Sequence, residues 1–321
     1  METFNQIPQY NAEHYAVVDL GSNSFHLLIC RLHNNKIQTV NKVKRKVRLA
    51  AGLDEHNNLS TDAISRGLDC LQLFAKHLAS IPLNNIRIVA TATLRIAQNS
   101  DIFLQQANKV LPLDIKLLSG EQEATTIYSG VAHTCNDNLS QKRLVLDIGG
   151  ASTELIVGQN FTAQQAISLN LGCVSFREQY FIDGQLTSEN FTAAIAAASS
   201  IIKPYCADFI KFGWQAVVGG SGTMQALAEI LAFRQQPIVI TPDFLSEIKT
   251  TLIHCKTIDA ISMENSTLKG LRADRSPVLA SGLSILIALF NCLAIKELRL
   301  SSGALREGLL FEMLPKSRLF S

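Results

Sequence analysis

A fourteen-residue pattern that occurs twice constrains the fold of this chain more than any other feature. The first copy is AVVDLGSNSFHLLI, from Ala16 to Ile29, and the second is LVLDIGGASTELIV, from Leu144 to Val157. Each copy reads as an apolar strand that ends at an aspartate, a tight turn of small residues, and a second apolar strand. The repeat therefore predicts two related hairpins, each at the start of one half of the chain.

Strand and helix signals alternate after each hairpin, which is typical of an α/β fold. This predicts domains over 12–126 and 127–302 with a cleft between them, and a C-terminal helix at 303–316 that packs back on the first domain. Strands are expected at 15–20, 25–32, 36–50, 86–91, 114–119, 143–149, 153–158 and 164–170, and in the segments AVVGG and ELRLSS. Helices are expected after Ser60, at 101–110, 187–210, 277–294 and 303–314, and from starts near Ser119 and at Ser221 or Gly222.

Composition excludes several classes of protein. A length of 321 residues favours two domains, and a net charge of +2 gives no electrostatic argument for a nucleic-acid partner. The seven cysteines form no CxxC pair and the amino-terminal segment has no signal pattern, so we expect a cytoplasmic protein. The uncharged stretch 277–295 is long enough to cross a bilayer, but Ser281, Gly282, Ser284 and Asn291 interrupt it. We expect a buried helix there and no membrane partner.

Three glycine-rich turns are candidates for anion binding, because small residues let backbone N–H groups approach a ligand closely. Two are the hairpin turns, and the third lies between a strand and a helix start, where the helix N-terminus also favours an anion. A single turn of this kind is more often only a hairpin turn, but three in one chain favour phosphate binding. They are Gly21-Ser22-Asn23-Ser24, Gly149-Gly150-Ala151-Ser152 and Gly219-Gly220-Ser221-Gly222-Thr223.

Carboxylates accompany both hairpin turns. Asp19 and Asp147 end apolar strands, where aspartate is unfavourable, and Glu154 alternates with apolar residues after the second turn. Carboxylates beside phosphate repel it unless a divalent cation lies between them, and Mg²⁺ takes one or two carboxylates together with water and substrate oxygens. The alternative is that each aspartate caps its own turn.

Two further side chains are candidates near the expected cleft. Glu123 is placed to act as a general base on water, although a charge at a helix start would look the same. Arg95 follows a strand end and offers a bidentate phosphate contact, with a surface ion pair as the alternative. The alternating basic residues Lys42, Lys44, Lys46 and Arg48 either guide a polyanion or protect an edge strand.

Six segments together resemble the exopolyphosphatase/guanosine pentaphosphate phosphatase family, within the superfamily of sugar kinases, actin and heat-shock chaperone ATPases. They are VVDLGSNSFHLLI, ATATLRIA, LLSGEQEA, LVLDIGGASTELIVG, VVGGSGTMQAL and LRLSSGALREGLL, spanning about 17–312. The resemblance implies two ribonuclease-H-like (actin-like ATPase) domains with an interdomain cleft. It also implies Mg²⁺-dependent removal of a terminal phosphate from inorganic polyphosphate or from pppGpp.

The resemblance also implies residue roles. Glu123 matches the catalytic base, and Asp19, Asp147 and Glu154 match metal-binding positions. The phosphate-binding positions are Gly21, Ser22, Asn23, Ser24, His26, Arg95, Gly149, Gly150, Ala151, Ser152, Gly220, Ser221, Gly222 and Thr223.

The chain departs from the family pattern in three places. Gln122 replaces the first of two glutamates, His26 stands where many relatives carry arginine, and Ala151 replaces a glycine, where its Cβ is expected to crowd the phosphate or restrict φ. The end of the chain at residue 321, without the helical region of longer members, favours short polyphosphate or a nucleotide over long polyphosphate.

The leading expectation is an exopolyphosphatase. The alternatives are a pppGpp 5′-phosphohydrolase and a non-hydrolytic sensor of ppGpp or a nucleotide. A homodimer is a further expectation.

Overall fold

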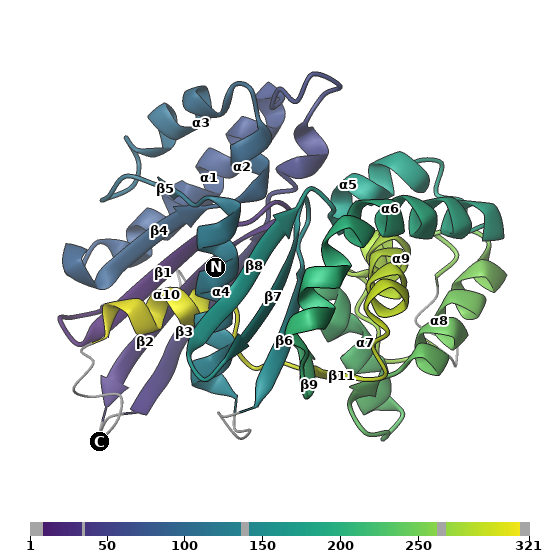
Figure 1. Ribbon diagram of the computed structural model, residues 1–321. Coiled ribbons are helices and arrows are strands. Elements are labelled where there is room, and N and C mark those ends of the chain that lie inside the picture. Colours follow the sequence, from purple (N-terminus) through teal and green to yellow (C-terminus); the bar gives the residue numbers. More distant parts are fainter. Residues whose placement is uncertain (1–8, 34–35, 136–140, 262–267, 315–321) are drawn as a thin grey trace. The chain divides into compact units, whose positions relative to one another are not determined.

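The computed structural model describes residues 9–33, 36–135, 141–261 and 268–314, which form an α/β chain with two sheets (Figure 1). Contacts divide the chain into two compact units, 1–119 with 306–321 and 120–305. The sequence-based ranges cut the chain at 126, inside a helix, whereas the contact division assigns that whole helix to the second unit. The predicted cleft between the domains stays a prediction.

The first sheet has the strand order β3-β2-β1-β4-β5. The three strands of the amino-terminal hairpins are antiparallel, whereas β4 and β5 run parallel to β1. The bounds are β1 (His14–Leu20), β2 (Ser24–His33), β3 (Lys36–Lys46), η1 (Ala50–Gly52), α1 (Thr61–Leu78), η2 (Leu83–Asn85), β4 (Ile86–Ala90), α2 (Ala92–Ile96), α3 (Ser100–Ala107) and β5 (Lys116–Leu117).

The second sheet has the order β10-β11-β9-β6-β7-β8. Strands β6, β7 and β8 are antiparallel, β9 and β11 run parallel to β6, and β10 adds an antiparallel edge. The bounds are α4 (Gly120–Thr134), β6 (Lys142–Ile148), β7 (Thr153–Gln159), β8 (Thr162–Leu169), α5 (Cys173–Tyr180), α6 (Ser188–Phe212), β9 (Ala216–Gly219), α7 (Gly222–Phe233), β10 (Val239–Ile240), α8 (Pro242–Cys255), α9 (Ser276–Leu293), β11 (Leu298–Leu300) and α10 (Leu305–Met313).

Five strands of each sheet therefore share one order and one pattern of directions, with β6 to β8 repeating β1 to β3. This confirms the duplicated α/β fold predicted from the sequence repeat, and also the ribonuclease-H-like type that the family resemblance implied. Both repeated segments fold as hairpins, and each strand end lies within one residue of its predicted position.

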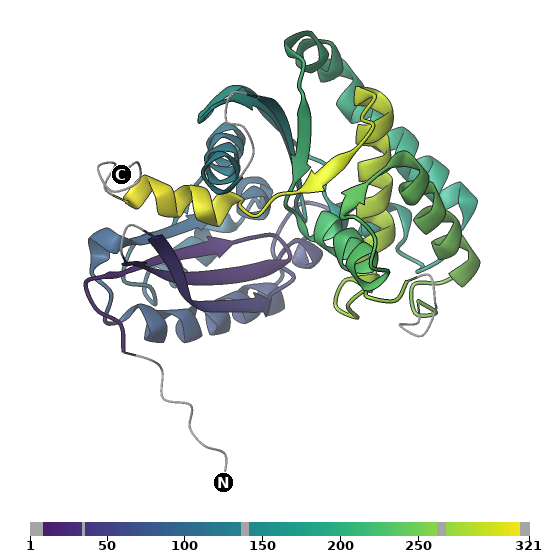
Figure 2. The ribbon, with the colours of Figure 1, turned by 90° about the horizontal axis from the view of Figure 1, so that it is seen from below.

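The core of the first unit lies between its sheet and the helices α1 and α3. The β2 side chain of Phe25 packs edge-on against Phe103 of α3, and Phe74 of α1 belongs to the same buried cluster. Helix α10 lies on the other face of this sheet (Figures 1 and 2). Its residues from Arg306 onward group with the first unit by contact, and Leu309 and Leu310 are buried.

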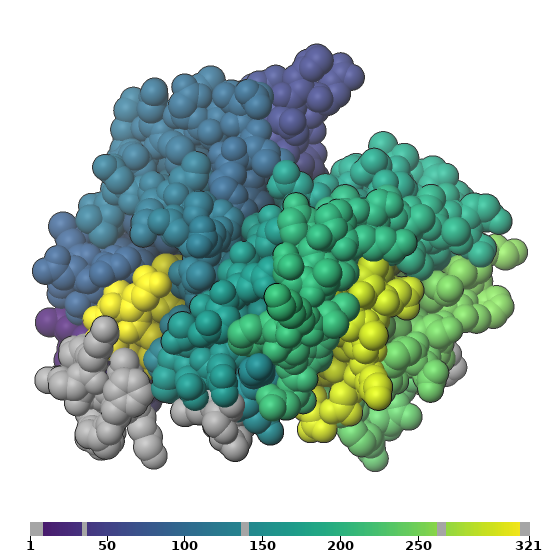
Figure 3. Space-filling model, in the orientation of Figure 1, coloured from purple at the N-terminus to yellow at the C-terminus, as the bar shows by residue number. Residues whose placement is uncertain are grey.

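Helix α9, predicted as a buried helix, packs against α5, α6, α7 and α8 inside the second unit. Among the described residues, two helices, α6 and α9, are long and apolar enough to cross a membrane by length and composition, but α9 is mostly buried in the structure. Helix α6 lies at the surface in the view of Figure 3, and only a minor part of its apolar stretch is buried. Burial on protein neighbours accounts for the apolar character of α9.

Some predicted bounds were wrong. The strand predicted over 36–50 ends at Lys46, because Arg48 adopts a left-handed φ of 54° that breaks the ladder. Helices α2, α5 and α8 were not predicted. Helix α8 had a visible signal, since Thr241 caps it through the backbone N–H of Phe244 and Pro242 occupies its first turn.

Candidate functional site

The two hairpin turns have matching geometry. Asp19 lies opposite His26 across β1 and β2, and Asp147 lies opposite Glu154 across β6 and β7. At the glycine that follows each strand, an added Cβ would come 2.9 Å or 3.0 Å from the carbonyl oxygen that closes the turn. Both turns therefore need glycine at that position, which explains why the repeat preserves it.

The turn amides are available to a ligand. Among the described residues, the N–H groups of Ser22, Asn23, Gly150 and Ala151 donate no hydrogen bond. The turn carbonyls, in contrast, are held by neighbouring backbone: Ala50 N–H donates to Ser22 and Arg48 N–H donates to Asn23, each at 2.9 Å. Successive unpaired N–H groups in a fixed turn make a concave site for an anion.

In the first unit, His26 faces the carboxylate of Asp19. The His26 Nδ1 and Asp19 Oδ2 atoms are 3.5 Å apart. Burial lowers the pKa of His26, and the charges of Arg306 and Lys44 lower it further, whereas Asp19 raises it. His26 is therefore a neutral polar group at pH 7, unlike an arginine at the same position.

Arg95 lies in the short helix α2, directly after β4. One of its Nη1 hydrogens is donated to the carbonyl oxygen of Leu118 at 3.0 Å. This bond holds the guanidinium at the carboxyl end of β4 and β5, the sheet edge where α/β proteins bind ligands. Its predicted phosphate contact stays a prediction.

The basic run lies on the edge strand β3. Lys44 pairs with His26 of β2 and Lys46 pairs with Ser24, so the lysines approach the first turn. Arg48 leaves the strand, and its N–H anchors Asn23 instead. The edge position agrees with the protective interpretation of the run, and guidance of a polyanion stays a prediction.

In the second unit, three neighbouring strands place polar side chains in one row. Asp147 of β6 pairs with Glu154 of β7, which pairs with Ser168 of β8. Directly opposite residues of antiparallel strands project from the same face. The hydroxyls of Ser152 and Ser168 both donate to Glu154 Oε1 at 2.7 Å, and only 1% of Glu154 is exposed. Two hydroxyl donors thus fix the orientation of a buried carboxyl group.

Glu123 joins this row from helix α4. An added Cβ at Gly120 would come 2.6 Å from the Cβ of Ser168, so the first turn of α4 lies directly on β8. Glu123 is buried, whereas its neighbours Glu121 and Gln122 are exposed. A charge that only complemented the helix dipole would not need burial, so this geometry favours a role for Glu123 in the site.

The three carboxyl groups interact strongly. Burial raises the pKa of Glu154 well above its usual value, and the nearby charges of Glu123 and Asp147 raise it further. The two serine hydroxyls oppose this shift. Functional sites commonly contain clusters of carboxyl groups in which burial and neighbouring charges shift a pKa strongly.

The second turn rests on a residue that sequence analysis missed. An added Cβ at Gly172 would lie 2.3 Å from the backbone nitrogen of Ala151, so Gly172 packs directly beneath the turn. The N–H groups of Cys173 and Val174 then donate to the carbonyls of Gly149 and Gly150 at 2.9 Å. The start of α5 thereby holds the turn in place.

The expected restriction of φ at Ala151 does not arise. The described residues with positive φ do not include any position from 149 to 152, so alanine fits this backbone without strain. The side chain is buried, with 6% exposed. Its effect on phosphate binding stays a prediction.

The third turn lies at the N-terminus of α7, where Ser221 makes no side-chain cap. An added Cβ at Gly222 would come 2.3 Å from Nη1 of Arg275, so that guanidinium lies against the first residue of the helix. Burial raises the pKa of the nearby Cys173 thiol to about 11, and the Arg275 charge opposes this shift. Arg275, which sequence analysis missed, therefore lies between the third turn and the start of α5.

The donor set fits a cation held by few protein ligands. Within the described ranges, no three His, Cys, Asp or Glu residues are arranged to enclose a metal ion. Asp147 and Glu154 are nevertheless adjacent, and the repulsion that raises the pKa of Glu154 would be relieved by a cation. Mg²⁺ commonly binds in this way, through one or two carboxylates and several waters.

The structure brings together these predicted residues of the second unit around one turn: Glu123, Asp147, Gly149, Gly150, Ala151, Ser152 and Glu154. The third turn, with Gly220, Ser221, Gly222 and Thr223, meets Arg275 at Gly222. In the first unit, Asp19, Gly21, Ser22, Asn23, Ser24 and His26 share the other hairpin, and Arg95 is held at the end of β4. The assignment of both groups to one site stays a prediction.

The sheet order and the paired acidic hairpins define a duplicated ribonuclease-H-like α/β protein. The sequence model of the Ppx/GppA phosphatase family matches residues 28–317. The chain belongs to this family, as the six resembling segments predicted.

Named relatives support this family assignment. A guanosine-5′-triphosphate,3′-diphosphate pyrophosphatase of Vibrio parahaemolyticus is 51% identical over 304 residues, which cover 95% of this chain and 60% of the relative. The pyrophosphatase of the same name from Aliivibrio fischeri is 50% identical over 300 residues, covering 94% and 59%. The chain thus spans about 60% of the length of these relatives.

Among solved structures, an exopolyphosphatase from Cytophaga hutchinsonii has a TM-score of 0.81 at 20% identity, covering 94% of this chain and 97% of its own. The Ppx/GppA enzyme of Aquifex aeolicus has a TM-score of 0.73 at 23% identity, covering 93% and 99%. These similarities establish a shared fold.

Proposed function

We propose that this protein hydrolyses the terminal phosphoanhydride of guanosine-5′-triphosphate,3′-diphosphate, that is pppGpp, and releases inorganic phosphate. The observation that carries the choice of substrate is the identity of about half of all aligned residues to pyrophosphatases named for this nucleotide. The sequence pattern predicted polyphosphate as the leading substrate, whereas the relatives favour the nucleotide. Polyphosphate hydrolysis is the second candidate, supported by the fold shared with an exopolyphosphatase.

The row of polar groups in the second unit supports this chemistry. Glu123 accepts a proton from a water molecule, whose oxygen attacks the terminal phosphorus while the bond to the bridging oxygen breaks. The unpaired N–H groups of Gly150 and Ala151 stabilise phosphate oxygens, and the guanidinium of Arg275 adds positive charge at the third turn. Ser152 and Ser168 hold Glu154 in a fixed orientation.

Mg²⁺ is the proposed cofactor, held by Asp147 and Glu154. When bound, it would neutralise phosphate charge and the mutual repulsion of the carboxylates. In the first unit, the turn from Gly21 to Ser24 and the guanidinium of Arg95 are proposed to bind further phosphate groups, and Asp19 is proposed as a further metal ligand.

The test is phosphate release by the purified chain, with pppGpp, short polyphosphate and long polyphosphate offered separately in Mg²⁺ and in EDTA. We expect release from pppGpp that needs Mg²⁺ and exceeds release from either polyphosphate. Faster release from polyphosphate would reverse the order of the two candidates. No release from any substrate would contradict the hydrolase proposal.

The variant Glu123→Gln separates a hydrolase from a nucleotide sensor. Loss of a general base is expected to slow turnover by about 10²–10⁴-fold while nucleotide binding, measured by equilibrium dialysis, is retained. The matched control is Glu121→Gln, two positions earlier in the same helix turn but exposed. A sensor would bind pppGpp equally well in all three forms and hydrolyse it in none.

A further inference from the structure

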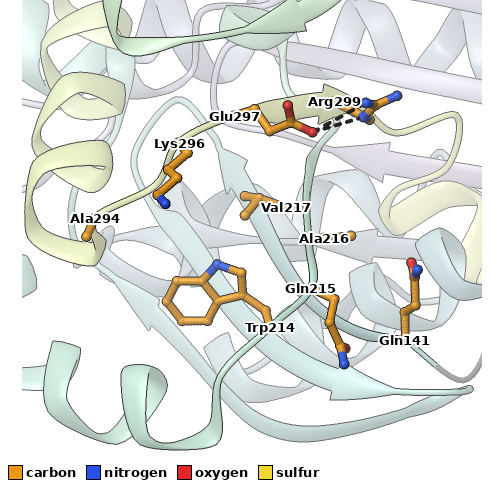
Figure 4. Close-up of a pocket in the computed structure, with 9 residues that line it drawn as sticks. All are labelled: Gln141, Trp214, Gln215, Ala216, Val217, Ala294, Lys296, Glu297 and Arg299. Carbon is orange, nitrogen blue, oxygen red and sulfur yellow. Dashed lines mark hydrogen bonds and ion pairs between the residues drawn. The ribbon is translucent and has the colours of Figure 1, made fainter.

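The second unit has a pocket of about 620 Å³ that the proposed function does not use (Figure 4). It lies where β9 and β11 begin, at Ala216 and Leu298, next to the start of β6 at Lys142. These three strands are parallel neighbours, and the acidic turn follows the other end of β6. A strand of seven residues separates the two places by roughly 20 Å, so they are distinct sites.

Two side chains point toward one space in this pocket. Figure 4 shows the indole of Trp214 and the ammonium of Lys296 directed toward each other, between Ala294 and Val217. Helix α9 ends at Leu293, and Ala294 adopts a left-handed φ of 52°, which turns the chain so that Lys296 reaches the pocket. Alanine is unfavourable in this conformation, so the surrounding structure must impose the turn.

The remaining polar groups leave Lys296 as the source of net charge. Glu297 and Arg299 form an ion pair with a 3.3 Å separation, so their charges offset each other. Within the described residues, the Lys296 ammonium makes no hydrogen bond or ion pair. The Gln215 Oε1 atom accepts a 2.6 Å hydrogen bond from the N–H of Lys142, which fixes this amide and leaves its NH₂ group as a donor.

The combination indicates a ligand with a flat ring and an anionic group. Trp214 is half-buried and lines the pocket. An indole face at a pocket stacks on planar aromatic rings, and bases stack on it whatever their identity. A lysine ammonium binds phosphate as a compact point charge. We propose that this pocket is a second binding site, for a nucleoside phosphate whose base stacks on Trp214 and whose phosphate lies at Lys296. This site does not depend on the proposed hydrolysis.

The test uses an intrinsic probe, because Trp214 is the only tryptophan of the chain. GMP, AMP and inorganic phosphate are each titrated into the full chain in EDTA, and tryptophan fluorescence is recorded. We expect saturable quenching by GMP and AMP, in the micromolar to millimolar range, and none by phosphate alone. Lys296→Ala should weaken nucleotide binding about tenfold or more, equivalent to about 1.4 kcal/mol.

Two control variants make the result decisive. Lys211→Ala removes the same charge from an exposed site outside this pocket and should leave binding unchanged. Asp147→Asn alters the acidic turn and should also leave it unchanged. The proposal is overturned if no nucleotide quenches saturably, if phosphate alone quenches as well as GMP, or if Asp147→Asn rather than Lys296→Ala weakens binding.

Discussion

Glu154 shows how one residue can oppose stability and serve the site. It is a buried carboxyl group among two other acids, and two serine hydroxyls fix one of its oxygens. Its pKa is raised in the folded state. Between pH 4.5 and that raised pKa, the folded protein therefore keeps a proton on Glu154 that the unfolded chain has released. The stabilising contribution of this proton is complete below the usual pKa of 4.5 and is lost as the pH rises through the folded-state pKa.

The variant Glu154→Gln is therefore expected to be more stable than the parent at pH 8 and similar to it at pH 4. Glutamine removes the cost of a buried charge and keeps an oxygen for the two serine hydroxyls. The measurement is Tm against pH in EDTA, where each kcal/mol corresponds to about 2–4 °C for a domain of this size. The exposed Glu121→Gln is the control and should show no such pH dependence. A lower Tm for Glu154→Gln at pH 8 would contradict the assigned pKa direction.

The residues missed from the sequence share one property: their role depends on contacts distant along the chain. Ser168 reaches Glu154 across a strand pair, Gly172 packs beneath the turn at Ala151, and Arg275 lies against Gly222. Local patterns located the turns and acids because those functions lie within a short segment. Burial distinguished Glu123 from Gln122, which spacing alone could not do.

Gly172→Ala is expected to impair substrate binding. Its added Cβ would meet the backbone of Gly150 and Ala151 at 2.3 Å, and backbone cannot move away as a flexible side chain can. The measurement is Kd for pppGpp by equilibrium dialysis, together with Tm. Gly184→Ala is the control: its φ of 73° strains alanine, but no atom lies within 4 Å of the added Cβ, so a loss of stability without loss of binding is expected. Equal binding losses in both variants would contradict the role of the turn.

At the scale of elements, periodicity and capping predicted what local sequence determines. The hairpins and α1 were found because alternation and the Ser60 cap are local signals. The short helices α2 and α5 escaped because tertiary contacts stabilise them more than propensity does. The apolar content of α9 alone fits either a membrane-spanning helix or a buried core helix. Its burial among four helices identifies it as a core helix.

Ile285→Ala in α9 is expected to lower the free energy of unfolding by about 2–5 kcal/mol, because the side chain is fully buried and its loss leaves a cavity. Urea denaturation of the purified chain measures the change. Ile210→Ala on α6 is the matched control, since 51% of that isoleucine is exposed, and it should cost far less. Similar small effects in both variants would show that α9 is not a core helix.

At the scale of the whole molecule, the chain is a duplication whose first unit includes a segment from the C-terminus. The repeat predicted the duplication because the two hairpins kept the same turn chemistry. The exact unit boundary could not be predicted from the sequence, because α4 follows a strand of one unit and precedes a strand of the other. Its packing against β7 and β8 assigns it to the second unit. The packing of α10 is likewise a long-range contact.

The first unit should therefore depend on α10 for its stability. Leu310 is 2% exposed in this helix, so Leu310→Ala is expected to remove about 2–5 kcal/mol from the first unit. Hydrogen exchange resolves where the loss falls: amides of β1 and α1 should exchange faster, and those of α9 should change little. Leu83→Ala makes the same substitution in the first unit at a leucine that is 52% exposed, and it should leave exchange unchanged. Faster exchange confined to α9 would show instead that α10 stabilises the second unit, and the contact-based assignment of the C-terminal helix would then be wrong.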